Sequence, residues 1–306
     1  MRQLNLFFSY FYLPKRPTPI TTDSVLINRI CSFIQPNFYR VNLKNWLIIF
    51  LISFYTVDSF AVVDNIGDTN DGNFTAGQNT LREAIANASA GDTITFGSSI
   101  SGQTIVIGSE LSIAQNLTID GTGQSISIDA NDTRRVFNVS AGNVTFRALH
   151  IQGGNAGSGN DGGGINTASG VTLTVDKSTL TGNQAQNGWA INAATGATIT
   201  ITNSTLQGNS ELTPVNLGGS IFADDSTTLT IKNTTIAGNT GELAGTGLRI
   251  VDATNVSLYN TLIVDNDNTT GGLDDCYSAG GTIAVNTNNL IEVGGMVVAQ
   301  VALPLW

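Results

Sequence analysis

The sequence predicts an all-β protein folded as a right-handed parallel β-helix, and three observations lead to this prediction. One pattern of residues recurs about every 27 residues over most of the chain. Each repeat holds short stretches in which apolar and polar residues alternate, as they do in strands. The chain has 34 glycines and only 12% charged residues, which suits an ordered protein with many polar turns. A fixed period in the range of roughly 20 to 50 residues indicates a stacked repeat architecture.

The repeats align on a central strand of the type Leu-Thr-Ile. Its starts are spaced 27, 29, 26, 30, 27 and 27 residues apart and lie at 117, 144, 173, 199, 229, 256 and 283. A second landmark, an aliphatic residue after a glycine-rich turn, lies eight residues before four of these starts, at Ile165, Ile191, Ile221 and Leu248. With a third strand before each Gly-Asn pair, every unit holds about three short strands. Stacked coils pair such strands and align their inward aliphatic side chains, whereas a propeller blade needs about 40 residues.

Asparagine recurs at one corner of the predicted coil, directly after the third strand. Asparagine tolerates the left-handed conformation, and its side-chain amide can bond to the asparagine of the next coil. Glycine at 164, 188, 218 and 247 permits a tight corner or a close approach of two coils. We therefore expect a structural turn ladder made of Asn183, Asn209, Asn239 and Asn266.

The first 61 residues form an N-terminal extension and a predicted signal peptide. An uncharged run from Trp46 to Val57 follows Lys44, and small residues precede a cleavage site after Ala61. A membrane anchor is the alternative, but Asp58 ends the run well short of the ~20 residues that a spanning helix needs. A signal that starts near Val41 would have ordinary length. Downstream of residue 61 the chain has seven basic and 21 acidic residues, which argues against binding to nucleic acid or to an anionic membrane.

Residues 62–93 are predicted to form an N-terminal cap, and residues 94–292 the β-helix. The segment TLREAIANAS, from Thr80 to Ser89, has a helical pattern, with Leu81, Ala84, Ile85 and Ala88 on one face and Arg82 and Glu83 expected in water. Such a helix can cover the apolar end of the first coil. The tail 293–306 lacks the repeat phase, and we expect it to be atypical, truncated or frameshifted.

The segment Thr80–Ile85 resembles the "CSLREA" element of bacterial secreted β-helix proteins, the group described as choice-of-anchor Q or polymorphic outer-membrane-like repeat proteins. The glycine turns and the N-S-T-L-x-G-N corners resemble that group's repeats, and the resemblance covers about residues 62–292. It implies a secreted protein at the cell surface or outer membrane of a bacterium. It also implies a cysteine pair around the element, where this chain has Phe74 and Asn79, and a partner for Cys276 that this chain lacks.

Parallel β-helices also include polysaccharide lyases and glycoside hydrolases, so acidic residues need attention. Catalysis in those enzymes needs clustered carboxylates, for calcium or for paired acid and base work. Asp225 and Asp252 are the best candidates here, because each lies four residues after its glycine-turn aliphatic residue and so occupies an equivalent corner on successive coils. Arg249 is expected nearby, facing outward. Solvated turn acids are the simpler interpretation, and we assign neither a catalytic nor a metal site to them.

Other polar residues carry weaker patterns. His150 is the only histidine and is expected to face outward as an ordinary surface residue. The acids of one segment superficially resemble a calcium loop but lack the Glu of an EF-hand; they are Asp64, Asp68 and Asp71, together with Asn70. A long corner gathers Asp265, Asp267, Asp274 and Asp275, where an ion could relieve repulsion.

The sequence therefore predicts a secreted or cell-surface β-helix scaffold, adhesive or structural, without catalysis. The alternative is a carbohydrate-active β-helix enzyme, and a degraded gene product is a third interpretation. Expected partners are extracellular glycans or proteins of a host or cell surface, with no nucleic acid and no membrane for the mature body. No cofactor is predicted, and calcium is the one ion that the acidic corners could hold.

Overall fold

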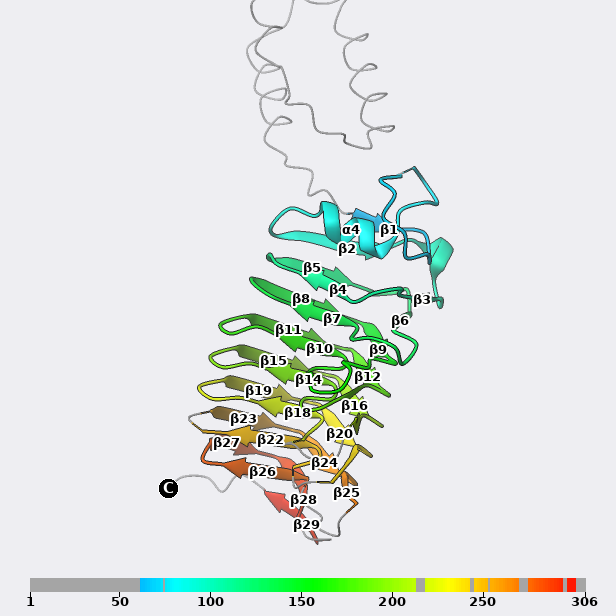
Figure 1. Ribbon diagram of the computed structural model, residues 1–306. Coiled ribbons are helices and arrows are strands. Elements are labelled where there is room, and N and C mark those ends of the chain that lie inside the picture. Colours follow the sequence, from blue (N-terminus) through cyan, green and yellow to red (C-terminus); the bar gives the residue numbers. More distant parts are fainter. Residues whose placement is uncertain are drawn as a thin grey trace, which may run out of the picture. The chain divides into compact units, whose positions relative to one another are not determined.

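The computed structural model describes residues 61–73, 75–212, 218–242, 245–252, 254–269, 275–293 and 296–300. The described residues do not include the predicted signal peptide, except for its last residue, Ala61, which begins the first strand. They also do not include Phe74, Asp274 and the end of the tail. The described chain is an all-β solenoid of about seven turns with about 27 residues per coil. Its strands stack in chain order along the solenoid (Figure 1). The predicted fold class is confirmed.

Three long sheets and one short sheet run along the solenoid. Sheet A contains the central strand of each repeat and comprises β1 (Ala61–Val63), β2 (Asp92–Phe96), β5 (Leu117–Asp120), β8 (Asn143–Arg147), β11 (Thr172–Asp176), β15 (Thr198–Thr202), β19 (Thr228–Lys232), β23 (Asn255–Tyr259) and β27 (Thr282–Thr287). Sheet C contains the strand after the glycine turn and comprises β4 (Leu111–Ile113), β7 (Phe137–Val139), β10 (Ile165–Thr167), β14 (Ile191–Ala193), β18 (Ile221–Ala223), β22 (Leu248–Val251) and β26 (Cys276–Ala279).

Sheet B contains the third strand of each repeat, before the Gly-Asn corner. It comprises β3 (Thr104–Val106), β6 (Ile126–Asp129), β9 (Leu149–Gln152), β12 (Thr179–Thr181), β16 (Thr205–Gln207), β20 (Thr235–Ala237), β24 (Leu262–Val264), β28 (Asn289–Val293) and β29 (Met296–Gln300). Sheet D was not predicted. Its strands have two residues each and follow the corner: β13 (Gln184–Ala185), β17 (Ser210–Glu211), β21 (Thr240–Gly241) and β25 (Asp267–Asn268).

The observed register matches the predicted repeat starts. Residues 117, 144, 173, 199, 229, 256 and 283 pair in succession across sheet A. In sheet C, Ile165 pairs with Ile191, Ile191 with Ile221 and Ile221 with Leu248. These four side chains are fully buried, and each such burial stabilises the fold by about 1.5–3 kcal/mol. The same row ends at Cys276, which pairs with Leu248.

The N-terminal end of the solenoid carries helix α4 (Leu81–Asn87), and a 3₁₀ turn, η2 (Ser98–Ile100), follows β2. Thr80 caps α4, and Glu83 completes a capping box with it. The prediction that Glu83 stays in water is wrong, because its side chain is fully buried. Its carboxylate accepts hydrogen bonds from the backbone N–H groups of Asp71, Gly72 and Thr80, and these bonds hold its pKa below the ordinary value against the opposing effect of burial.

The C-terminal coil is less regular than the others. The register between β23 and β27 shifts by one residue at Val256 and Ser257. Ile283, the predicted start of this coil, pairs with Val256 just before the shift. Its side chain is nevertheless 37% exposed. Strand β29, in the predicted atypical tail, pairs antiparallel with β28 and adds a reversed strand to sheet B.

Candidate binding groove

The predicted asparagine ladder is present and buried. The side-chain N–H of Asn183 donates to Oδ1 of Asn209 at 3.0 Å, Asn209 donates to Asn239 at 2.9 Å, and Asn239 donates to Asn266 at 2.7 Å. Each of these Oδ1 atoms also accepts the backbone N–H of the preceding asparagine in the row. A buried amide that lacked partners would cost about 1–3 kcal/mol, so the ladder satisfies groups that the tight corner removes from water.

The left-handed conformation lies one residue earlier than expected. Gly182, Gly208 and Gly238 have φ values of 62°, 60° and 62°, and Asp265 has a φ of 54° at the fourth coil. The ladder asparagines do not adopt positive φ. The turn therefore needs the glycine for its backbone and the asparagine for its side chain, which explains why the two residues recur as a pair.

The ladder ends on an acid. Asp275 is almost fully buried, and its Oδ1 accepts both the backbone and the side-chain N–H of Asn266. Burial raises the pKa of this carboxyl to about 6, and the nearby charges of Glu292 and Asp265 act in the same direction. Asp265 and Glu292 meet directly, because the backbone N–H of Asp265 donates to the Glu292 carboxylate at 3.0 Å. Asp267 is exposed, and it donates its backbone N–H to the carbonyl of Asn239.

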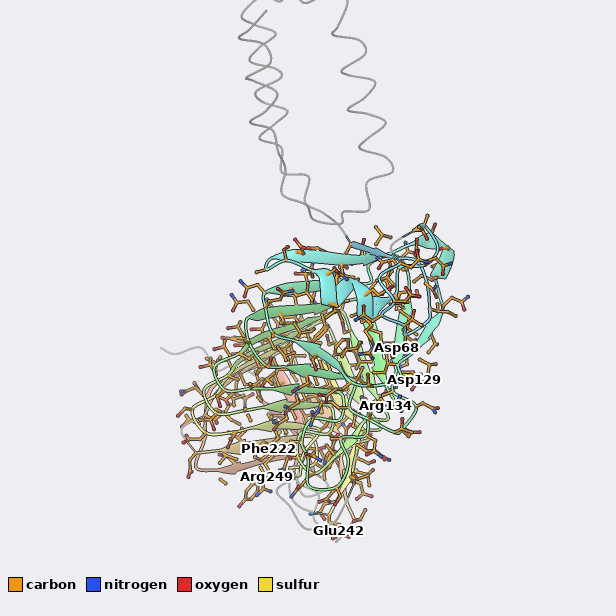
Figure 2. All side chains as sticks on the ribbon, turned by 45° about the horizontal axis from the view of Figure 1, so that its top comes forward. Asp68, Asp129, Arg134, Phe222, Glu242 and Arg249 are labelled. Atoms are coloured by element: carbon orange, nitrogen blue, oxygen red, sulfur yellow. The ribbon has the colours of Figure 1, made fainter. Side chains whose placement is uncertain are left out.

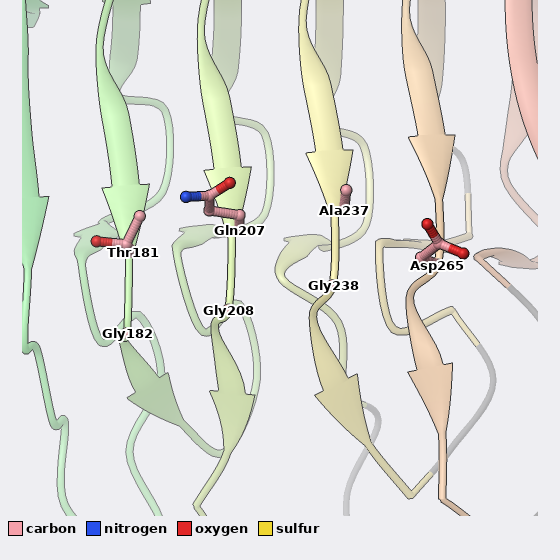
Figure 3. Close-up of a pocket in the computed structure, with 7 residues that line it drawn as sticks. All are labelled: Thr181, Gly182, Gln207, Gly208, Ala237, Gly238 and Asp265. Carbon is pink, nitrogen blue, oxygen red and sulfur yellow. The ribbon is translucent and has the colours of Figure 1, made fainter.

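Above the ladder, a shallow groove of about 460 Å³ crosses four successive coils between sheets B and D (Figure 3). Equivalent positions of the four coils line it. They are the last residue of each sheet B strand or the residue after it: Thr181, Gly182, Gln207, Gly208, Ala237, Gly238 and Asp265.

The floor of this groove is backbone, because glycine occupies the corner in three of the coils. No heavy atom lies within 4 Å of the position that a Cβ atom would take at Gly182, Gly208 or Gly238. The hydroxyl of Thr181, the amide of Gln207 and the carboxylate of Asp265 provide hydrogen-bonding groups along the rim (Figure 3). The arrangement can hold an extended polar ligand along the stacking direction.

His150 faces outward on β9, one coil before the first coil of the groove, but it is not an ordinary surface residue. It is half-buried, and its Nε2 lies 2.6 Å from the Thr181 hydroxyl at the groove's first coil. Its Nδ1 lies 3.4 Å from the Ser127 hydroxyl. Burial lowers the pKa of the imidazole, which Asp129 partly opposes. Threonine and histidine are therefore linked at this end of the groove.

The acidic pair singled out from the sequence lies elsewhere. Asp225 and Asp252 are exposed and occupy equivalent corners, since the Ser226 N–H donates to the Asp252 carbonyl at 3.2 Å. Oδ1 of Asp225 accepts the Ser226 hydroxyl. No group of three or more His, Cys, Asp or Glu side chains in the described part of the chain is close enough to hold a metal ion.

Arg249 lies at the outward position after Leu248, and a neighbouring side chain covers it. Its guanidinium carbon lies 4.6 Å from the centre of the Tyr277 ring, which is a cation–π contact. Arg249 pairs in register with Phe222, which is also buried, and both are labelled in Figure 2. Burial lowers the pKa of the guanidinium, against the effect of Tyr277. This contact is structural and lies apart from the groove.

The acids of the N-terminal cap bind protein groups. Asp64 accepts the backbone N–H groups of Gly77 and Asn79, and Asp68 forms an ion pair with Arg82 at 2.8 Å. Asp71 accepts the N–H of Asn73, and Asn70 is exposed. Asn79, which stands where the resemblance implies a cysteine, donates its side-chain N–H to the Val62 carbonyl at 2.7 Å. These hydrogen bonds hold the described part of the loop.

Cys276 is a free thiol at an inward position of the last coil. Burial raises the pKa of this thiol, with Asp275 acting in the same direction, so it is a poor nucleophile. It occupies the row of Ile165 and Ile191 as a small apolar side chain.

Comparison of the chain with protein-family models, with curated proteins and with solved structures found no match. Within the described residues, no helix is long and apolar enough to cross a membrane.

Proposed function

We propose that this protein is a secreted or cell-surface β-helix scaffold that binds an extended extracellular glycan along the groove of Figure 3, without cleaving it. The observation that carries the proposal is that four successive coils line one groove with equivalent residues. Neighbouring strands in a sheet are about 4.8 Å apart, so equivalent residues recur at this spacing along the groove. A ligand with repeating units can contact such residues in the same way on each coil.

The groove rests on a rigid support. The asparagine ladder lies under the corner that carries Gly182, Gly208 and Gly238, and its amides bond from coil to coil. A preorganised surface loses little conformational entropy when it binds, which favours affinity from a row of individually weak hydrogen bonds. Sugar hydroxyls can both donate and accept, so they match the hydroxyl, amide and carboxylate groups of the rim.

The composition of the groove supports binding rather than cleavage. Glycosidic bond hydrolysis uses two carboxyl groups on either side of the scissile bond. Among the residues that line the groove, Asp265 is the only acid. The carbohydrate-active enzyme therefore has less support than the adhesive scaffold, and secretion remains a prediction from the sequence.

The test is a glycan array probed with the full chain, together with a matched pair of variants on the same coil. Ala237→Trp fills the groove from its lining, whereas Thr228→Trp adds the same side chain at an exposed position of sheet A. We expect the parent to retain particular polysaccharides, Ala237→Trp to lose them and Thr228→Trp to keep them. Loss in both variants, or no glycan binding by the parent, would contradict the groove as a binding site. Release of reducing ends by the parent would favour the enzyme.

A further inference from the structure

The outer face of sheet A carries threonines in a regular two-dimensional array. Three successive strands, β11, β15 and β19, present the motif Thr-x-Thr in the same register. The array consists of Thr172, Thr174, Thr198, Thr200, Thr228 and Thr230. The buried residues between them, such as Leu173 and Ile199, face the core, so both threonines of each strand face outward.

One column of this array extends well beyond three coils. Through Thr145, Thr118 and Thr93 it reaches β2, and in the other direction it ends at Ser257 of β23. A hydroxyl therefore occupies the same outward position on seven consecutive strands. With neighbouring strands about 4.8 Å apart, the column is about 29 Å long.

The array is uniform in register. The register runs one-to-one from β5 to β23, and the first shift in sheet A comes between β23 and β27. Figure 1 shows these strands stacked with little change in direction. Threonine is β-branched and restricted at χ1, so equivalent threonines on paired strands present hydroxyl and methyl groups at regular spacing. The spacing is about 4.8 Å between strands and about 6.7 Å along a strand.

The hydroxyls of the array are available to a ligand. Within the described residues, none of the six threonine hydroxyls forms a hydrogen bond to another side chain or to a backbone group. Other threonines of the same coils do, such as Thr202, which donates to Asp176, and Thr167, which donates to the Asn192 carbonyl. No charged side chain lies within the two columns. Asp176 and Lys232 lie in the adjacent column, at the edge of the array.

We propose that this face of sheet A binds ice. Hexagonal ice presents planes of oxygen atoms whose two repeats are close to those of the threonine array. A regular surface that orders water at these spacings, with methyl groups between the hydroxyls, matches crystalline water better than it matches liquid water or a soluble sugar. The proposal does not depend on the groove, because the groove lies between sheets B and D.

Sheet B provides a matched control. Its outward residues include one column of threonines, Thr179, Thr205 and Thr235, but the second column has Thr181, Gln207 and Ala237. Sheet B therefore lacks the two-dimensional repeat of threonines. Thr200 of sheet A and Thr205 of sheet B lie on the same coil, so substitutions at these two positions can be compared directly.

The experiment measures adsorption of the full chain to a growing ice surface and inhibition of ice recrystallisation. Variants Thr200→Tyr and Thr205→Tyr carry the same change, and thermal melts confirm that both fold as the parent does. We expect the parent and Thr205→Tyr to adsorb and to keep crystals small, and Thr200→Tyr to lose both effects. Thr200→Val, which replaces the hydroxyl with a methyl group, should lose part of the effect.

Absence of ice adsorption by the parent would overturn the proposal, as would equal loss in the two tyrosine variants. Retention of the parent on crystalline cellulose or chitin, without adsorption to ice, would also overturn it and identify a polysaccharide crystal as the partner. Ala237→Trp, the groove variant, should leave ice adsorption unchanged, so failure of one proposal is distinguishable from failure of the other.

Discussion

Two asparagine rows run along the solenoid at different corners, and they differ in burial. Asn183, Asn209, Asn239 and Asn266 are buried after sheet B, whereas Asn203, Asn233 and Asn260 are exposed between sheets A and B. The exposed row also bonds from coil to coil, with two contacts of 3.1 Å. Its members adopt positive φ values of 52°, 50° and 48°. The exposed asparagines are needed for the positive φ of their turn. The buried asparagines are needed for their side-chain hydrogen bonds, because water does not reach the groups that they bond.

We expect the largest loss of stability from a charged substitution at an inward position, and we compare it with the same substitution at an outward position. Ile221→Asp places an unpaired charge between Ile191 and Leu248 and should lower the free energy of unfolding by roughly 3–5 kcal/mol. Thr228→Asp, on the following strand but exposed, should lower it by less than about 1 kcal/mol. Denaturant titration measures both, and equal losses would mean that the inward assignment is wrong.

The two asparagine rows can be compared directly by one substitution in each. Asn239→Ala removes an amide that accepts from Asn209 and donates to the Leu206 carbonyl and to Asn266, and it should cost about 3 kcal/mol. Asn233→Gly keeps the positive φ and should cost less than about 1 kcal/mol. Thermal melts of the two variants test the difference, and a larger loss for Asn233→Gly would reverse the interpretation of the rows.

The acidic end of the buried row should make stability depend on pH. The folded-state pKa of Asp275, about 6, lies above the ordinary value of 3.8. Between these values the folded chain retains a proton that the unfolded chain has released. Stability should therefore fall as pH rises from about 4 to about 6, by an amount on the order of 1–3 kcal/mol.

Asp275→Asn keeps the Oδ1 acceptor for Asn266 and removes the charge. We expect it to abolish this part of the pH dependence and to raise the melting temperature at pH 7. Melting curves at pH 4.5 and 7 measure both effects. An unchanged pH profile in the variant would show that Glu292 or Asp265, which surround Asp275, is responsible instead.

The smallest effect is expected at the exposed acidic pair. Asp225→Asn combined with Asp252→Asn should change the free energy of unfolding by less than about 0.5 kcal/mol, because both side chains are exposed. Glycan binding should also persist. Turnover of acidic and neutral polysaccharides, measured with and without calcium, provides the check. Cleavage by the parent that disappears in the double variant would establish the enzyme in place of the scaffold.

The coil register could be predicted because inward residues repeat strictly. A one-residue slip would turn the buried aliphatic side chains outward, so the inward positions of Ile191 after the glycine turn and of Ile199 in the central strand fix the pairing. Sheet D could not be predicted in this way, since strands of two residues, such as Gln184–Ala185, show no alternation.

The candidate site was harder to predict than the fold. Outward position does not determine burial: Arg249 was placed at an outward position, but the sequence did not indicate that Tyr277 covers it. Glu83 was expected in water because its hydrogen-bond donors come from a loop whose path local patterns do not reveal. The groove depends on the glycine before each corner asparagine, at 182, 208 and 238, and the recurrence of this glycine was the signal that could have indicated it.

The direction of the buried asparagine row has a further consequence. Each amide donates to a backbone carbonyl of the preceding coil, but the bonds between ladder side chains all run toward the C-terminal coils and end at Asn266. Asp275 stands at that end and accepts the side-chain N–H of Asn266. Duplication or deletion of a whole coil within the row would preserve both its direction and its terminal acid. The protein can therefore change length in steps of about 27 residues, provided that each new coil brings its own asparagine and the last one is still followed by Asp275.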